Sequence, residues 1–141
     1  MKDTMLLGHG ADTYCLFFPH NDYVGKYNAG GGLTKNIEII VDKPHNMYMG
    51  AWVGTGGISV LALIALYVLY IIQSVKIYFR KDYEDMDFLD ITGAGIMLGV
   101  TGFLFTGLVD DSTVSVMPIF YTMLGLGIVT NILQRDKGQI S

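Results

Sequence analysis

Histidine side chains are the part of this sequence best suited to chemistry. All three histidines lie within residues 1–50, among scattered acidic residues. Imidazole titrates near neutral pH, so it can serve as a general base, as a cation toward phosphate, or as a metal ligand. His45 is the main catalytic candidate, because Pro44 fixes the approach of the chain and a long uncharged stretch begins a few residues later. A histidine that caps a helix end or anchors at a membrane interface would show the same pattern.

The other two histidines, His9 and His20, are interpreted as ordinary loop residues. No two histidines have the i, i+4 spacing of a helical metal motif, but ligands in loops can lie anywhere in a sequence. The one cysteine, Cys15, excludes a disulfide framework and a cysteine-based zinc site. We therefore expect no metal and no cofactor, and keep an extracytoplasmic metal-binding protein as an alternative.

The low fraction of charged residues indicates what kind of structure must position these side chains. Of the 141 residues, 16% are charged and 51% are hydrophobic, whereas about 25% are charged in ordinary soluble domains. This composition excludes a disordered tail, a coiled coil and a basic nucleic-acid binder, so no nucleic-acid partner is expected. It predicts a membrane protein whose first partner is the lipid bilayer.

Three stretches, residues 51–75, 91–109 and 112–134, contain no charged residue. A span needs roughly 18–20 apolar residues, and so short a chain has no layers with which to bury three apolar helices. The sequence predicts an all-α membrane protein: a membrane domain over residues 51–141, preceded by an extracytoplasmic loop segment over residues 1–50.

Basic residues give the predicted orientation. They lie after the first span and after the third, whereas the turn Asp110-Asp111 has none, so the positive-inside rule places residues 1–50 and this turn outside and the C-terminus in the cytoplasm. Asp110 and Asp111 then share a side of the membrane with His45, where they could orient it or bind hydroxyl groups; a plain polar turn is the alternative. The basic residues are Lys76, Arg80, Lys81, Arg135 and Lys137.

Glycines are concentrated in the second stretch, where Gly95 and Gly99 form a GxxxG motif. Glycine costs about 1 kcal/mol per site against alanine in a helix, and close helix–helix packing in lipid is the usual reason to keep it. We expect this helix to pack in a bundle. It also motivates the main rival function: a non-catalytic small membrane protein, or a remnant, that packs with a partner through this helix.

The segment Lys43-Pro-His-Asn-Met-Tyr-Met49, followed by Gly56 and a long apolar helix, resembles the O-antigen ligase superfamily of polytopic bacterial membrane proteins. The ligase motif is His, then Asn, Ser or Gln, then nine residues and Gly-x-x-Gly. His45, Asn46 and Gly56 match it, and Ser59 stands at the second glycine. The segment from Leu7 to Tyr14 is similar to the family's Gly-x-Gly segment. His20-Asn21 also finds Gly31 at the motif distance, but only His45 precedes a membrane helix.

This resemblance implies a glycosyltransferase of the cell envelope, acting at the outer side of the bacterial cytoplasmic membrane. It would move a glycan from an undecaprenyl-diphosphate carrier to a hydroxyl of a glycan, lipid or protein acceptor. His45 would act as general base in a metal-independent inverting displacement. The residues expected to bind substrate are Lys43, Asn46, Tyr48, Asp110 and Asp111.

The sequence departs from the family in its arginines. The family uses arginines in outer loops, whose fork geometry suits a diphosphate, whereas Arg80 and Arg135 here are both predicted to be cytoplasmic. Family members also usually have ten or more membrane helices. The chain is therefore expected to be the C-terminal portion of a larger bundle, inactive when isolated, with an upstream half of the same enzyme as its partner.

Overall fold

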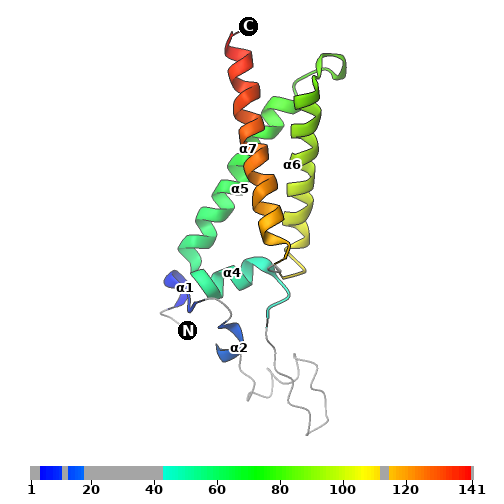
Figure 1. The fold of residues 1–141 in the computed structure, drawn as a ribbon. Helices are drawn as coiled ribbons and strands as arrows, with labels where there is room; N and C mark the ends of the chain where they lie inside the picture. The colour runs from blue at the N-terminus through cyan, green and yellow to red at the C-terminus, as the bar shows by residue number, and fades with distance from the viewer. Residues whose placement is uncertain (1–3, 11–12, 18–42, 112–114, 141) are drawn as a thin grey trace. The chain divides into compact units, whose positions relative to one another are not determined.

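The computed structural model describes residues 4–10, 13–17, 43–111 and 115–140, and their regular structure is entirely helical (Figure 1). Three helices are long and apolar enough to cross a membrane, which confirms the predicted all-α class. The helices are α1 (Thr4–Leu7), α2 (Tyr14–Phe17), α4 (Met47–Thr55), α5 (Gly57–Tyr78), α6 (Phe88–Thr106) and α7 (Met117–Ile140), with a 3-10 turn at Tyr83–Asp85.

The chain divides into two compact units, which are described separately. The first comprises Met1–Leu61 and Leu108–Asp111, and the second comprises Ala62–Gly107 and Ser112–Ser141. The first unit contains the histidine motif and the turn Asp110-Asp111, and the second contains most of the membrane-spanning length.

The first predicted helix, over residues 51–75, is interrupted at Gly56. Helix α4 ends at Thr55 and α5 begins at Gly57, because Gly56 has φ 88°. This left-handed conformation is open to glycine and strained for other residues. The Gly56 N–H still donates to the carbonyl of Trp52, which closes the last turn of α4. The membrane helix therefore starts later than predicted and continues to Tyr78.

The predicted second and third helices, over residues 91–109 and 112–134, also have different bounds. Helix α6 begins at Phe88 because Asp87 and Asp90 form a capping box, in which each side chain accepts a hydrogen bond from the other's backbone N–H. Helix α7 begins at Met117, with Pro118 in its first turn, a position where the missing proline N–H has no cost. The predicted start at residue 112 lies outside the described residues.

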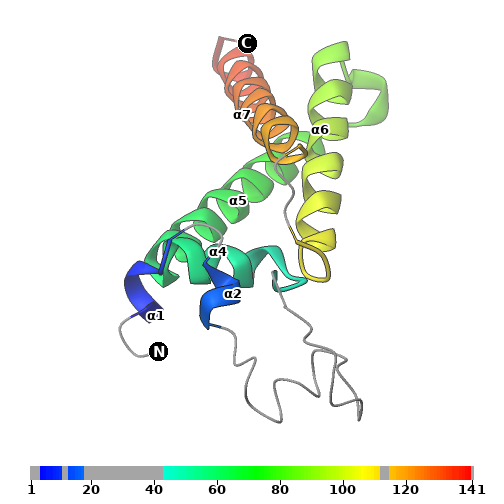
Figure 2. The ribbon, with the colours of Figure 1, turned by 60° about the horizontal axis from the view of Figure 1, so that its bottom comes forward.

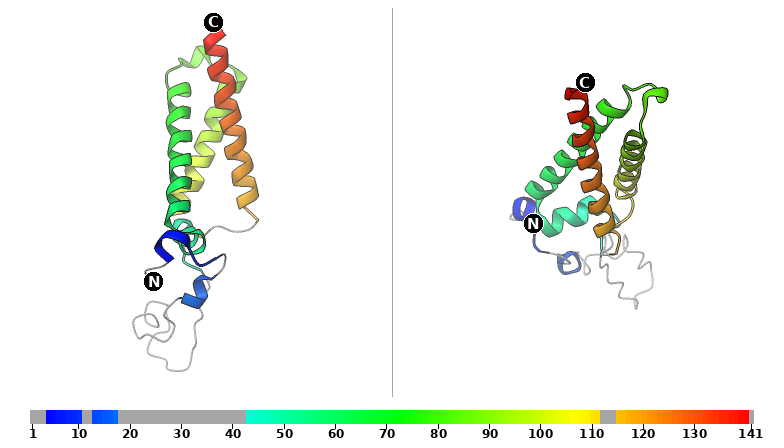
Figure 3. Two further views of the ribbon diagram at one scale, coloured as in Figure 1. Left: turned by 90° about the vertical axis from the view of Figure 1, so that its left-hand side faces the viewer. Right: turned by 45° about the horizontal axis from the view of Figure 1, so that its top comes forward.

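Within the second unit, α6 and α7 run antiparallel side by side (Figure 3). Phe120 of α7 stacks on Phe103 of α6 with ring centroids 4.6 Å apart, and meets the edge of Tyr67 at 5.7 Å. Val100 of α6 and Leu124 of α7 are also buried. These contacts give α6 and α7 a common apolar face.

Helices α5 and α7 are joined by polar side chains. Tyr78 Oη donates to Asn131 Oδ1 at 2.8 Å, and Asn131 Nδ2 donates to Ser74 Oγ at 2.8 Å. Ser74 Oγ in turn donates to the carbonyl of Tyr70 at 2.9 Å. Asn131 is only 2% exposed, so this chain of hydrogen bonds holds the register of two apolar helices where hydrophobic packing alone is weakly directional.

The glycines of α6 differ in how closely other side chains pack against them. A Cβ on Gly93 would lie 2.8 Å from the side chain of Thr130 and would overlap the ring of Tyr78. In contrast, a Cβ on Gly95, Gly99 or Gly102 would meet no atom of the described residues within 4 Å, and all three glycines are exposed. The expected close packing is therefore seen at Gly93, while the GxxxG pair lies on an open face of the helix in the described part of the chain.

Candidate functional site

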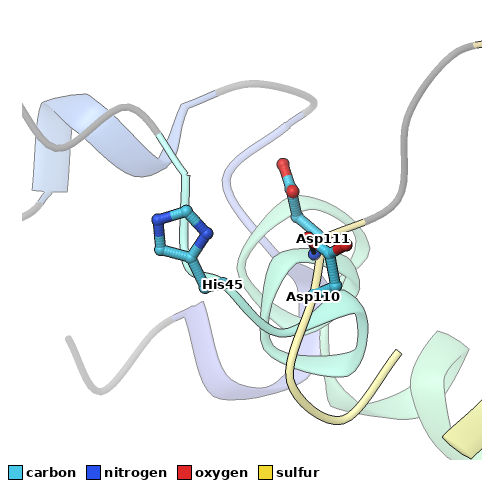
Figure 4. A group of neighbouring side chains, drawn as sticks. All are labelled: His45, Asp110 and Asp111. Carbon is cyan, nitrogen blue, oxygen red and sulfur yellow. Dashed lines mark hydrogen bonds between the residues drawn. The ribbon is translucent and has the colours of Figure 1, made fainter. Parts of the chain in front are cut away.

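The structure brings His45 together with Asp110 and Asp111. One ligand atom from each of the three side chains lies within 4.8 Å of the others (Figure 4). His45 and Asp110 are exposed and Asp111 is half-buried. The histidine comes from the segment before α4 and the aspartates from the segment after α6, as the hypothesis that an aspartate orients His45 requires.

Asn46 holds these two segments together. Its Oδ1 accepts a hydrogen bond from the N–H of Met49 at 2.9 Å, which makes Asn46 the N-cap of α4. Its Nδ2 donates to the carbonyl oxygen of Leu108 at 2.8 Å. The helix cap is therefore Asn46 and not His45, so the interpretation of His45 as a cap is wrong.

Lys43 lies at the edge of the same site. Its Nζ is 3.7 Å from Asp111 Oδ2, with the two side chains 44% and 22% exposed. Asp110 Oδ1 accepts a hydrogen bond from the N–H of Asp111 at 2.9 Å. One ammonium group and one imidazole thus lie close to two carboxylates.

Tyr48 lies in the first turn of α4 and is half-buried. Desolvation by burial raises the pKa of its hydroxyl, so Tyr48 stays a neutral phenol at physiological pH. A neutral phenol can donate a hydrogen bond to a sugar or phosphate oxygen. Substrate binding by Tyr48, three positions after His45 in the sequence, stays a prediction.

The segment Leu6–Gly10 lies backbone to backbone against the junction of α4 and α5. His9 N donates to Val53 O at 2.7 Å, and Gly10 N donates to Gly54 O at 2.9 Å. These bonds satisfy carbonyl groups at the C-terminal end of α4 that have no partner within the helix. The short helices α1 and α2 also contact α4 (Figure 2).

Sequence reasoning identified the glycine segment and the histidine motif separately, but it missed that they touch. Gly8 has φ 71° and Gly56 has φ 88°, and a Cβ on Gly8 would lie 2.6 Å from Gly56 N. The glycines around Gly8 and around Gly56 are both visible in the sequence. No local pattern, however, indicates that two segments so far apart in the chain are in contact. His9 contributes its backbone here and is not part of the cluster around His45, while His20 lies outside the described residues.

Ser59 of the motif and the two arginines of the chain also have defined places. Ser59, which stands where the resemblance has a glycine, donates from Oγ to the carbonyl of Thr55 at 3.0 Å and so spans the break between α4 and α5. Arg80 and Arg135 both belong to the second unit and are exposed. The first unit therefore has no arginine, and Lys43 is the cation beside His45 among its described residues.

Comparisons with protein-family models, with curated proteins and with solved structures found no match to this chain. The features that bear on function are the chemistry of the histidine–aspartate cluster and the three helices with the length and composition of membrane spans.

Proposed function

We propose that this chain carries the histidine-bearing part of a membrane glycosyltransferase of the O-antigen ligase type. The donor would be a glycan on undecaprenyl diphosphate, and the acceptor a hydroxyl of a glycan, lipid or protein. The reaction would take place at the outer side of the bacterial cytoplasmic membrane, with the C-terminus in the cytoplasm. The observation that carries the proposal is the approach of His45 to Asp110 and Asp111, within 4.8 Å, in a chain that has three helices suited to cross a bilayer.

In the proposed reaction His45 accepts the proton of the acceptor hydroxyl. The hydroxyl oxygen forms a bond to the anomeric carbon, and the bond between that carbon and the diphosphate oxygen breaks. Its electron pair leaves with undecaprenyl diphosphate. A carboxylate beside the imidazole favours the imidazolium ion that forms and holds the ring in one orientation. Asp110 and Asp111 would supply both effects, and the support for this is that one carboxylate oxygen of each lies within 4.8 Å of a ring nitrogen of His45.

The proposal also needs cations for the diphosphate. In the described part of the first unit, Lys43 is the candidate, and it already lies 3.7 Å from Asp111. A lysine is a point charge, whereas the bidentate geometry that best fits phosphate belongs to arginine. We therefore assign further diphosphate contacts to an upstream part of the same enzyme, which this chain would complete.

The direct test is glycan transfer with the chain in its native gene context, together with any neighbouring upstream membrane segment. Removing a general base typically costs 10²–10⁴-fold in rate, so His45→Ala should lower transfer by about that factor. His9→Ala is the matched control, because His9 contributes a backbone hydrogen bond and lies outside the cluster. Unchanged transfer in His45→Ala would refute the proposed role.

A cation site is a second candidate function, favoured by the same three donor atoms. One imidazole nitrogen and two carboxylate oxygens are suitable ligands for zinc and related divalent ions. Stoichiometric zinc after purification without chelator, lost in His45→Ala, would support this function. Absence of zinc binding in a titration would remove it. The two functions are exclusive at His45, because a ring nitrogen that ligates a metal cannot also accept the acceptor's proton.

One observation favours the alternative function, a non-catalytic small membrane protein that packs with a partner. Gly95, Gly99 and Gly102 lie on an open face of α6, which would suit a neighbouring membrane helix. This function predicts no transferase activity even when upstream membrane segments are co-expressed. Transfer that depends on His45 would exclude it.

A further inference from the structure

We propose that Asn46 is a positioning residue, whose side-chain amide sets the separation between His45 and the aspartates of the Asp110-Asp111 turn. The inference that this separation matters for catalysis rests on the proposed function. The positioning itself can be tested without any activity. This role is argued from two hydrogen bonds of the Asn46 side chain, while substrate binding by Asn46 stays a prediction.

The amide of Asn46 uses both of its ends at once. Its oxygen accepts from the N–H of Met49 at 2.9 Å, and its nitrogen donates to the carbonyl of Leu108 at 2.8 Å, 62 residues away in sequence. Asn46 is the immediate neighbour of His45, and Leu108 precedes the two aspartates by two and three residues. A single side chain therefore links the two short segments that carry the cluster.

A second contact between these segments is weaker. Lys43 and Asp111 are 3.7 Å apart and both are partly exposed, and an exposed ion pair of this kind contributes little to stability. The hydrogen bond within the turn, from Asp111 N to Asp110 Oδ1, orders the aspartates but does not reach His45. The amide of Asn46 is thus the main polar link between the histidine and the turn in the described residues.

Substitution can separate the two functions of the Asn46 amide, which are to cap α4 and to bond the carbonyl of Leu108. Asn, Asp and Ser are comparably good N-caps, so Asn46→Asp and Asn46→Ser keep the start of α4. Neither can donate to Leu108 O: a carboxylate has no donor at neutral pH, and a serine hydroxyl is too short to serve the cap and the carbonyl together. Loss of positioning with retention of α4 is therefore expected for both variants.

The experiment measures proximity in the full chain. In a Cys15→Ser background, His45→Cys and Asp111→Cys introduce a thiol pair, and a short bis-maleimide reports how readily the two positions are bridged. We expect the chain with Asn46 to cross-link efficiently and the Asn46→Asp and Asn46→Ser chains to cross-link several-fold more slowly. Thr106→Ala is the control, because the Thr106 hydroxyl bonds only the nearby carbonyl of Phe103 among the described contacts.

Helical circular dichroism and a single elution peak in detergent show that each variant is folded. Equal cross-linking in all three Asn46 backgrounds would overturn the proposal. Where glycan transfer is measurable, positioning further predicts a lower kcat with KM for the donor changed less than about twofold, since misplacement of a catalytic group affects the transition state. A cross-linking effect without any transferase activity, when the neighbouring upstream membrane segments are co-expressed, would keep Asn46 as a positioning residue and refute the proposed function alone.

Discussion

The backbone of Gly8 lies so close to that of Gly56 that neither residue has room for a Cβ. A Cβ on Gly8 would be 2.5 Å from Gly54 O, and a Cβ on Gly56 would be 2.6 Å from Gly8 N. Both glycines also have positive φ, 71° and 88°. The contact joins the N-terminal segment to the break between α4 and α5, directly after the helix that begins at the histidine motif.

Alanine at either of these glycines should therefore destabilise the first unit. A positive φ of this kind costs a non-glycine residue about 1–3 kcal/mol, and overpacking adds about 1–3 kcal/mol. Thermal or denaturant unfolding in detergent micelles measures the loss. Gly50→Ala, within α4, is the control, since its Cβ would lie at an ordinary contact distance of 3.6 Å from Pro44 Cγ. Equal stability of Gly8→Ala, Gly56→Ala and Gly50→Ala would contradict the observed contact.

The two kinds of glycine in α6 should respond in opposite ways to alanine. Gly93→Ala should cost about 1–3 kcal/mol by overpacking, because its Cβ would meet Tyr78 and Thr130. Gly99→Ala should raise stability by up to about 1 kcal/mol through helix propensity, since its Cβ meets nothing within 4 Å. Unfolding midpoints measure both changes. If Gly99→Ala instead destabilises the protein and changes its oligomeric state, a second helix covers the open face.

The hydrogen bond between Tyr78 and Asn131 should show a measurable coupling energy. Interhelical hydrogen bonds in membrane proteins contribute about 0.6 kcal/mol on average in double-mutant cycles. We expect a coupling of about this size between Tyr78→Phe and Asn131→Ala, because the bond is 2.8 Å long and buried. Thr122→Ala paired with Tyr78→Phe gives the control cycle, since Thr122 bonds the carbonyl of Pro118 in its own helix. Zero coupling for Asn131 would mean that the two helices hold another register.

Asp87 should make stability depend on pH in the acid range. Its carboxylate accepts a hydrogen bond from Lys137 Nζ at 2.8 Å, and this bond is the largest reason that the pKa of Asp87 lies well below its usual range. The backbone N–H of Asp90 adds to the effect. A depressed pKa stabilises the folded state above the unfolded carboxyl pKa of about 3.9, and this contribution is lost as the pH falls below that value.

The corresponding measurement compares Asp87→Asn with the parent chain between pH 7 and pH 3. The parent should be more stable at pH 7, and the difference should shrink as the pH falls below about 4. Asp136→Asn, an exposed position on α7, is the control and should follow the parent. A difference between parent and Asp87→Asn that stays constant over this range would rule out the bonded carboxylate as its cause.

The candidate site was partly predictable because its residues lie next to long uncharged stretches, which are easily recognised in the sequence. His45 precedes an uncharged stretch, and the Asp110-Asp111 turn separates two others, so the topology alone predicts that they share one side of the membrane. The capping residues Asp87 and Asp90 also had a sequence signature, at the spacing of a capping box, which would have moved the start of α6 to Phe88.

The sequence by itself determined the all-α class and the three apolar helices. Whether a segment can cross a bilayer depends on the hydropathy of roughly 20 consecutive residues, which is a local property of the sequence. Only the tertiary structure decided that Asn46 bonds Leu108, that Gly8 meets Gly56 and that Asn131 joins Ser74 to Tyr78. Each of these contacts links residues far apart in the chain. Their geometry depends on backbone conformation and helix register at both ends, and no periodicity in one segment encodes the position of the other.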